Sequence, residues 1–453
     1  MSSELVLEEG QILGIANQSL VPDIAAELGS ALGTMLGEGS LVVTARDNYP
    51  PSRMLKRAFS AGLMSTGVTV MDFHAATTPE LVFAIKRLGA KAGIQFTVSP
   101  WERDGIAVKV FDTQGIEYSR ERIEELVERA RSRRIVRSLP TSIGWVTYAE
   151  YIHDIYTAAV VSYVDVHAIA GKRFRVVCDT NFGPSSEVLP NLLSEVGVEG
   201  ILLNSHRPPL RGPVTHMPSP RSVAVLREMV KASDAVVSTV LCADATRVLL
   251  IDDEGVPLSS EELLGVLLIG MPAGTRVVVS EAMMTVEDEI AKRTGAKIIR
   301  VRGSRHDLVR VARRSGSHLV ATCGNEIIFT EFSTAPDGIL AMLKTIELLA
   351  KTGESLSELR GALPERRLIH STVRLEGVDY LRLLNRLKMR KIDSYFLTIR
   401  GLRVRVGNVW VNVEADPDAL QLSAESVEGA DEAVDKLSRE LQTLIKETKS
   451  SGY

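Results

Sequence analysis

Ser99 is one of the residues in this 453-residue sequence whose hydroxyl could do covalent chemistry. It directly follows the apolar stretch 92–98 and precedes Pro100 in a turn. A serine hydroxyl acts as a nucleophile when a base and a cation stand beside it. A serine that only ends a strand in a turn is the other interpretation, and the local sequence leaves both open.

A second group of chemically able residues lies in the segment 242–247. Cys242, Asp244 and Thr246 place a thiol, a carboxylate and a hydroxyl at alternate positions. Mg²⁺ prefers oxygen ligands and dehydrates reluctantly, so one carboxylate with a thiol and a hydroxyl should hold it weakly. The segment therefore predicts at most a poor magnesium site.

Arg247 ends the same segment and has two possible roles. Its guanidinium could hold a phosphate through paired hydrogen bonds. Alternatively, it could pair with Asp252 or Asp253 at the turn that follows.

The cysteines suggest a minor alternative. Three of them, Cys178, Cys242 and Cys323, are too few and too far apart for a disulfide framework, so reduced thiols are expected. Thiolates suit zinc or copper, and a metal or redox site made by Cys242 with Cys323 is conceivable. Isolated cysteines are more often small buried hydrophobic residues.

The elements that must position these residues follow a repeated strand and helix pattern from Leu41 onward. Short β-branched apolar runs alternate with amphipathic stretches, which is typical of βα units in parallel or mixed sheets. The pattern recurs in three tandem units, and after Pro364 it changes to strands followed by a long helix. The sequence predicts three α/β domains and a C-terminal α+β domain around a central cleft. The expected boundaries are 1–140, 141–250, 251–364 and 365–453.

The composition is that of an ordinary globular protein, with 45% hydrophobic and 24% charged residues. The net charge of -4 offers no broad basic field for a nucleic-acid backbone. The first twenty residues lack the pattern of a secretory signal, and no 18-residue apolar run follows. We therefore expect a cytoplasmic protein that binds neither nucleic acid nor a membrane.

Three long segments resemble one family, the α-D-phosphohexomutases. They are residues 14–36, 46–73 and 332–359, the last of which reads FSTAPDGILAMLKTIELLAKTGESLSEL. The order of three α/β domains and a smaller α+β domain is also similar to that family. The resemblance implies a reaction that moves phosphate between the 1- and 6-positions of a hexose through a phosphoserine, with Mg²⁺ as the cofactor.

At the family's chemical positions, however, this sequence departs from the family. Ser99 falls on the phosphoserine position, but the flanking histidine is replaced by Pro100 and a nearby lysine by Ala107. The family's metal loop of three carboxylates corresponds to residues 242–247, where Asp244 is the remaining carboxylate. We therefore expect Mg²⁺ binding to be weak or absent.

The family's sugar and phosphate loops are altered as well. Asn325 and Glu326 occupy the sugar loop, and we expect them to face the cleft and favour a neutral or cationic ligand over a phosphosugar. Like charges about 5 Å apart repel by about 3 kcal/mol at an effective dielectric near 20, so carboxylates in the phosphate loop predict no phosphate binding. The loop carries Glu414, Asp416 and Asp418.

Arg46 and Asp47 are retained where the resemblance places the family's Gly-Arg-Asp, after the first long strand. We expect a structural role for them, because such a pair at a strand end fixes the following loop. The supporting arginine that the family carries near residues 11–14 is lost.

Three functions remain open. We favour a relative that has lost the usual mutase activity and acts by binding an altered small molecule or by regulating an active mutase partner. The alternative is an active phosphohexomutase that uses Ser99 and Arg247 with weakened metal and phosphate sites. The third is a new reaction in the same cleft. A phosphosugar ligand and a homodimer are both possible in these schemes.

Overall fold

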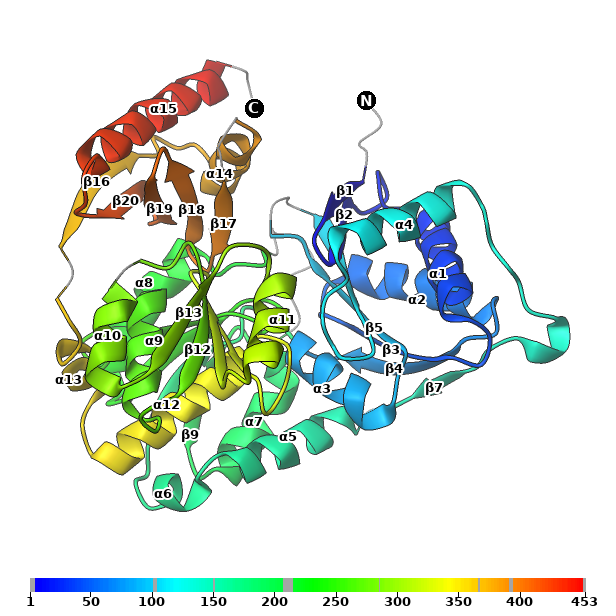
Figure 1. Ribbon diagram of the computed structural model, residues 1–453, viewed down its shortest axis with the longest axis horizontal. Helices are drawn as coiled ribbons and strands as arrows, with labels where there is room; N and C mark the ends of the chain where they lie inside the picture. Colours follow the sequence, from blue (N-terminus) through cyan, green and yellow to red (C-terminus); the bar gives the residue numbers. More distant parts are fainter. Residues whose placement is uncertain are drawn as a thin grey trace.

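The computed structural model describes residues 5–100, 104–149, 151–206, 215–284, 286–365, 367–390 and 394–450. Four sheets run in chain order from the blue unit on the right of Figure 1 to the orange and red unit at the upper left. The first three are mixed sheets with helices, and the fourth is an antiparallel sheet covered by helices. The expected fold class is confirmed. No helix within the described ranges is both long and apolar enough to span a bilayer.

The first sheet has seven strands in the order β1-β2-β6-β5-β3-β4-β7. Alternate residues of its central strand face opposite layers: Val42 packs with α1, α2 and α4, while Val43 packs with α3. This alternation follows from the two-residue period of a strand. The elements are β1 (Val6–Glu8), β2 (Gln11–Ile15), α1 (Pro22–Leu36), β3 (Leu41–Arg46), α2 (Pro50–Met64), β4 (Thr69–Ala75), α3 (Thr78–Leu88), β5 (Ala92–Val98), β6 (Gly105–Phe111), α4 (Arg120–Arg131) and β7 (Val146–Tyr148).

Two local features fix the loops of this sheet near the cleft. Thr77 and Glu80 form a capping box at the start of α3, so the helix begins at a defined residue beside the sheet. Asp47 accepts hydrogen bonds from the backbone N–H of Tyr49 and of Val98, at 3.0 and 2.7 Å. Asp47 therefore ties the end of β3 to the end of β5, in line with the structural role expected for it.

The second and third sheets each have four strands and share one hydrophobic core. The strand orders are β11-β10-β8-β9 and β13-β12-β14-β15. The second unit comprises α5 (Ile152–Tyr163), α6 (Val166–Ala170), β8 (Arg175–Asp179), α7 (Ser185–Glu195), β9 (Glu199–Leu203), α8 (Pro220–Ala232), β10 (Val237–Leu241) and β11 (Val248–Ile251). The third comprises α9 (Ser260–Ile269), β12 (Arg276–Ser280), α10 (Val286–Thr294), β13 (Lys297–Val301), α11 (Arg305–Ser315), β14 (Leu319–Thr322), β15 (Glu326–Phe329), α12 (Gly338–Thr352) and α13 (Leu356–Gly361).

The fourth sheet is antiparallel, with the order β16-β20-β19-β18-β17, and has its own hydrophobic core. It docks on the third unit through Arg403, which is 2% exposed and contacts Glu261 at 2.7 Å and the carbonyl of Ala282 at 2.6 Å. Gly324 permits this approach, because a Cβ there would lie 2.7 Å from the carbonyl oxygen of Leu397. The elements are β16 (Leu368–Arg374), α14 (Tyr380–Met389), β17 (Tyr395–Thr398), β18 (Gly401–Val406), β19 (Val409–Ala415), β20 (Ala419–Glu425) and α15 (Ala430–Ser450).

The domain boundaries expected from the sequence stay predictions. Two strands bear on them: β7 lies beyond residue 140 but pairs with β4 in the first sheet, and residue 250 falls inside β11. Both strands are short, which makes their apolar patterns hard to see in the sequence.

Candidate functional site

A cavity of about 370 Å³ lies where the four units meet. Its wall includes Lys109 from the first unit, His216 from the second, Glu326 from the third and Tyr395 from the fourth. This volume is within the ordinary range of small-molecule sites. The cavity is therefore the central cleft that the domain order predicts.

Ser99 stands directly after β5, where it is 4% exposed. Its backbone N–H donates to the carbonyl of Gly105 at 2.8 Å. The preceding residue, Val98, packs against Ala243, so the serine turn and the segment 242–247 are neighbours. The fold thus brings these two predicted parts of the site together.

Asp244 is fully buried, and groups of the chain itself contact both of its carboxylate oxygens. Oδ2 lies 2.5 Å from the Lys109 ammonium and accepts a hydrogen bond from the Thr78 hydroxyl at 2.9 Å. Oδ1 accepts hydrogen bonds from Thr246 Oγ1 at 2.7 Å and from Cys242 Sγ at 3.2 Å. Burial alone would raise the pKa of Asp244, but the Lys109 ammonium holds it well below its usual range.

Lys109 is a site residue that the sequence interpretation missed. The family's lysine position is Ala107 here, so the sequence predicts no cation at this place. Lys109 lies two residues further along β6 and therefore on the same face of the strand. Its side chain is 5% exposed and reaches Asp244. The alternation of side chains along β6 is the signal that could have found it.

Glu326, Arg247 and Arg305 form an ion-pair network in the cavity wall. Glu326 Oε1 lies 2.8 Å from Arg247 Nη2 and also contacts Arg305 Nη1. Arg305 in turn holds Glu117 through two nitrogens, one of them at 3.0 Å. Burial would raise the pKa of Glu326, but the two arginines lower it.

Glu326 thus lines the cavity as expected, but its carboxylate is already paired. The suggested pairing of Arg247 with Asp252 or Asp253 is wrong. Asp252 instead contacts Arg360 at 2.7 Å, and Asp253 accepts hydrogen bonds from Ser357.

Asn325 was expected to face the cleft, but it is not among the residues that line the cavity. Its side chain holds a turn in place instead. Its side-chain oxygen accepts a hydrogen bond from the Ser260 hydroxyl at 2.9 Å, and its amide donates to the carbonyl of Leu258 at 3.3 Å. Its φ of 56° is the left-handed conformation that asparagine tolerates better than most residues. Asn325 therefore fixes the turn between β14 and β15 against the start of α9.

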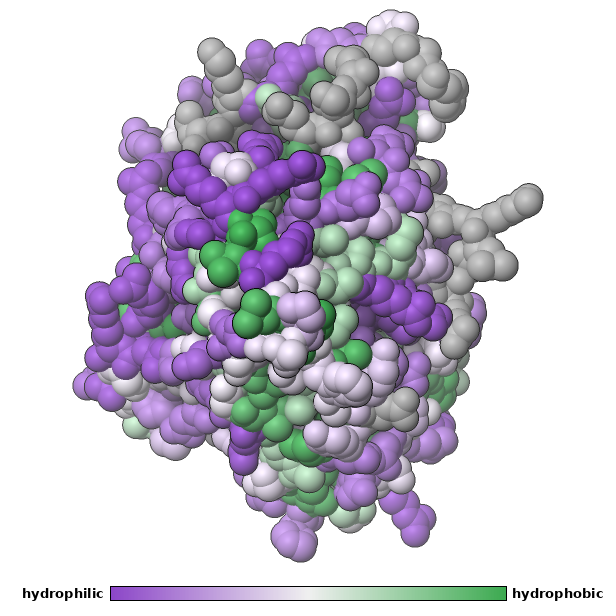
Figure 2. All heavy atoms as spheres, turned by 90° about the vertical axis from the view of Figure 1, so that its right-hand side faces the viewer, coloured by the Kyte–Doolittle hydropathy of each residue, from purple (hydrophilic) through white to green (hydrophobic). Residues whose placement is uncertain are grey.

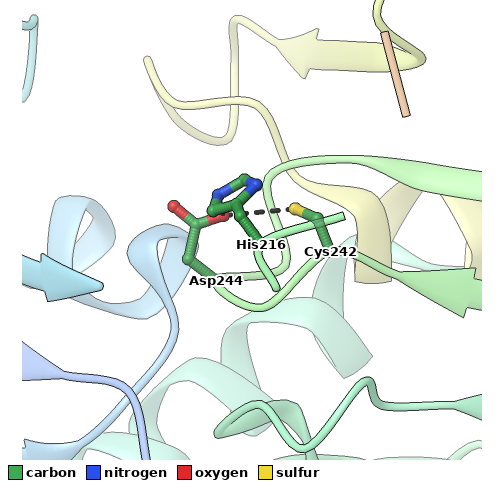
Figure 3. A group of neighbouring side chains, drawn as sticks. All are labelled: His216, Cys242 and Asp244. Atoms are coloured by element: carbon green, nitrogen blue, oxygen red, sulfur yellow. Dashed lines mark hydrogen bonds and ion pairs between the residues drawn. The ribbon is translucent and has the colours of Figure 1, made fainter. Parts of the chain in front are cut away.

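The side chains that could bind a metal together with Cys242 are His216 and Asp244, and not Cys323. The Cys242 thiol, the Asp244 carboxylate and a ring nitrogen of His216 lie within 4.8 Å of one another, and the three side chains point toward one another (Figure 3). Cys323 is buried elsewhere in the cavity wall and is not in this group. Burial raises the pKa of the Cys242 thiol to about 12.

Mg²⁺ does not fit this arrangement. The ion demands near-octahedral oxygen ligands and keeps several waters. The segment 242–247 offers one carboxylate, and Lys109 and Thr78 already contact one of its oxygens. Weak or absent magnesium binding stays a prediction, and this choice of donor atoms is consistent with it.

The acidic loop of the fourth unit is less repulsive than its sequence indicates. Arg400 contacts Glu414 at 2.7 Å and Asp416 at 3.0 Å. Arg400 lies 14 residues before Glu414, and the antiparallel pairing of β18 with β19 brings the two segments together. The guanidinium therefore offsets part of the negative charge, and no cationic nest for phosphate is formed by these residues.

The chain belongs to the phosphoglucomutase/phosphomannomutase family. Models of alpha/beta/alpha domains I, II and III of that family match residues 7–134, 149–255 and 267–367. A phosphoglucomutase/phosphomannomutase of Thermococcus kodakarensis is 31% identical, covering 89% of this chain and 90% of that protein. A probable phosphoglucosamine mutase of Methanopyrus kandleri is 27% identical, covering 97% of this chain and 98% of that protein.

Solved structures share the same fold. A putative phosphomannomutase of Thermus thermophilus has a TM-score of 0.76 at 19% identity, over 97% of this chain and all of that chain. A phosphoglucomutase/phosphomannomutase family protein of Burkholderia thailandensis has a TM-score of 0.74, also at 19% identity, over 97% of each chain.

Proposed function

We propose that this phosphohexomutase-family protein binds a small polar ligand in its central cavity and does not perform the usual magnesium-dependent phosphoryl transfer. The observation that carries the proposal is the internal pairing of charges. Three cations, Lys109, Arg247 and Arg305, contact three carboxylates, Asp244, Glu326 and Glu117.

Phosphoryl transfer depends on cations that offset charge on the phosphoryl group. Here those cations already contact carboxylates. A phosphosugar would have to displace the carboxylates from the cations before its phosphate could bind. Breaking one buried pair costs several kcal/mol, because it leaves an unpaired charge behind. This cost argues against a dianionic ligand in the cavity.

The ligand class that suits such a wall is neutral and rich in hydroxyl groups, such as an unphosphorylated sugar or polyol. Thr322 and Ser304 bring hydroxyls to the wall, and Tyr395 and Phe396 bring aromatic surface. Neutral hydroxyls can hydrogen-bond to the paired carboxylates and guanidinium groups without separating them.

The second candidate is an active phosphohexomutase, and two observations favour it. Ser99 stands on a strand end beside the segment 242–247, and relatives that cover nearly the whole chain are named as mutases. In that case Ser99 would be the nucleophile and Arg247 would hold phosphate.

A single set of assays separates the two functions. Glucose 1-phosphate, mannose 1-phosphate and glucosamine 1-phosphate are supplied with a bisphosphosugar activator and Mg²⁺, and turnover is followed in a coupled assay. We expect rates far below about 1 s⁻¹, the lower end of the ordinary range. Intact-mass spectrometry should find no phosphate on Ser99. Turnover and a phosphate that both vanish in Ser99→Ala would establish the second candidate.

We also propose a second copy of the chain as a partner, bound at the edge of the first sheet. β7 is an edge strand of that sheet. Tyr148, which is 60% exposed, is its last residue, and Trp145, which is 74% exposed, directly precedes it. Hydrophobic side chains reach the surface between hydrophilic ones on this side of the molecule (Figure 2).

An edge strand presents unpaired N–H and C=O groups to another strand. β7 is three residues long, so the exposed aromatic side chains would supply most of the contact. Light scattering should show a dimer that Trp145→Lys converts to a monomer. A monomeric parent chain would contradict this partner without affecting the proposed ligand.

A further inference from the structure

We propose that His216, Cys242 and Asp244 form a binding site for a thiophilic divalent metal, with Zn²⁺ as the natural occupant. The three side chains come from two separate segments, one shortly before α8 and one following β10. A hydrogen bond of 2.9 Å from the Ala243 N–H to the His216 carbonyl holds these segments together. The group is therefore assembled by the fold and not by one loop.

The spacing of the donor atoms suits a tetrahedral ion. Cys242 Sγ and His216 Nε2 each lie 3.2 Å from Asp244 Oδ1. Zinc bonds of about 2.0–2.3 Å place neighbouring ligand atoms roughly 3.3–3.8 Å apart. All three atoms lie within 4.8 Å of one another, so side-chain rotations that adjust these separations would bring them onto one ion.

His216 provides an independent indication of a ligand. The residue is 1% exposed, yet within the described residues its Nδ1 has no hydrogen-bond partner, and its Nε2 has the 3.2 Å contact with Asp244 Oδ1 but no hydrogen-bond geometry. Buried polar groups are normally satisfied, because an unpaired one costs about 1–3 kcal/mol. A bond to a metal ion would satisfy the ring nitrogen that faces Asp244.

The neighbours of Asp244 would support the site. Lys109 and Thr78 contact Oδ2, while Thr246 donates to Oδ1 from its hydroxyl at 2.7 Å and from its backbone N–H at 3.3 Å. The ion would take the place of the longer of these two bonds and of the Cys242 S–H contact. Hydrogen bonds of this kind orient the carboxylate ligands of protein metal sites. The positive charge of Lys109 opposes the ion, and the thiolate formed at Cys242 offsets that charge.

Binding replaces the Cys242 S–H contact with a sulfur–metal bond and releases the thiol proton to solvent. Three protein ligands leave a fourth tetrahedral position. His216 lines the cavity, so this position faces the ligand space and would take water or a hydroxyl oxygen of the ligand. The donor set of sulfur, nitrogen and one oxygen selects Zn²⁺ over Mg²⁺.

The test uses the full-length protein, freed of metal with a chelator and titrated with Co²⁺ as a spectroscopic probe for zinc. We expect one equivalent of Co²⁺ to produce a sulfur-to-cobalt charge-transfer band and tetrahedral visible bands, both of which one equivalent of Zn²⁺ removes. A large excess of Mg²⁺ should leave them unchanged. Absence of the charge-transfer band in the parent protein would overturn the inference, and this arm needs no variant.

Variants then assign the ligands. Cys242→Ser should abolish the charge-transfer band, and His216→Gln should weaken Co²⁺ binding at least tenfold. Cys178→Ser and Cys323→Ser are matched controls, since both are buried thiols outside the group. A band that survives Cys242→Ser but disappears in Cys323→Ser would place the metal elsewhere and refute this site. This inference concerns the same cavity as the proposed function, but the two are tested separately. A negative Co²⁺ titration would refute the metal site and would not affect the proposed function, which is tested by turnover and by phosphate on Ser99.

Discussion

Two loops of this protein that carry carboxylates, residues 242–247 and 414–418, have unlike surroundings. In the first, the Asp244 side chain is fully buried and contacts the buried ammonium of Lys109. In the second, Glu414 and Asp416 are about one-third exposed and share Arg400, whose side chain is 18% exposed. Both loops pair carboxylates with a basic residue of the same chain, but only the first does so out of contact with water.

This difference in burial determines what each pair does. A buried pair has a large cost of separation, because either partner alone is a charge without solvent. An exposed pair is screened by water and salt and contributes little. The loop at Asp244 should therefore be rigid and resist a new anion, whereas the loop at Glu414 should tolerate substitution.

Lys109→Met gives the largest expected effect. It leaves the Asp244 carboxylate buried without its cation, so the free energy of unfolding should fall by about 3–5 kcal/mol. Urea denaturation at pH 7 with a chelator present would measure this. The control is Lys91→Met, at an exposed lysine just before β5. It should change the free energy of unfolding by less than about 0.5 kcal/mol.

A double variant sharpens the same comparison. Lys109→Met combined with Asp244→Leu removes both charges and should be more stable than the sum of the single effects predicts. Simple additivity would contradict direct pairing of the two groups.

Arg403→Met tests a buried pair at the contact between the third and fourth units. Loss of the guanidinium leaves Glu261 buried, so we expect a loss of about 3 kcal/mol and looser docking of the fourth unit. Limited proteolysis and small-angle scattering would report the looser docking. Arg405→Met, on the same face of β18 but partly exposed, is the control. Equal effects of the two variants would show that the Glu261 contact does not anchor the unit.

Asp47 should make stability depend on pH in the direction opposite to a salt-bridged carboxylate. Burial raises the pKa of Asp47 to about 6, above its ordinary value of 3.8. The native state therefore binds the proton more tightly, and this contribution to stability is present below about pH 4 and is lost as pH rises through 6.

We expect the parent protein to lose roughly 2 kcal/mol between pH 4 and 7 relative to Asp47→Asn, because one pKa unit corresponds to about 1.4 kcal/mol. Urea midpoints of the two proteins across this range give the difference. A constant difference would mean that Asp47 titrates normally in the folded protein.

The sequence predicted the parts of this molecule that depend on local pattern. Alternating apolar strands and amphipathic helices gave the α/β units, and Ser99 was correctly placed after a strand. Lys109 was not predicted because the family's lysine position is Ala107, although the strand period puts both residues on one face of β6.

Other parts depend on contacts between distant segments and carry no local signal. Arg305 and Glu117 are 188 residues apart in the chain, yet they form part of the cavity wall. His216 lies in an irregular segment, and only the packing of that segment on Ala243 brings it to Cys242. Likewise, the pairing of Arg247 with Glu326 required the third unit to fold against the second.

Arg400→Gln should have the smallest effect and completes the comparison of the two loops. The substitution removes the charge that Glu414 and Asp416 share, but both carboxylates keep contact with water. The expected loss in the free energy of unfolding is below about 1 kcal/mol and should shrink further at high salt. Urea denaturation at low and high salt, with Lys109→Met measured alongside, tests this. A loss as large as that of Lys109→Met would mean that exposure does not explain the difference between the loops, and that Arg400 has a structural role at the end of β17.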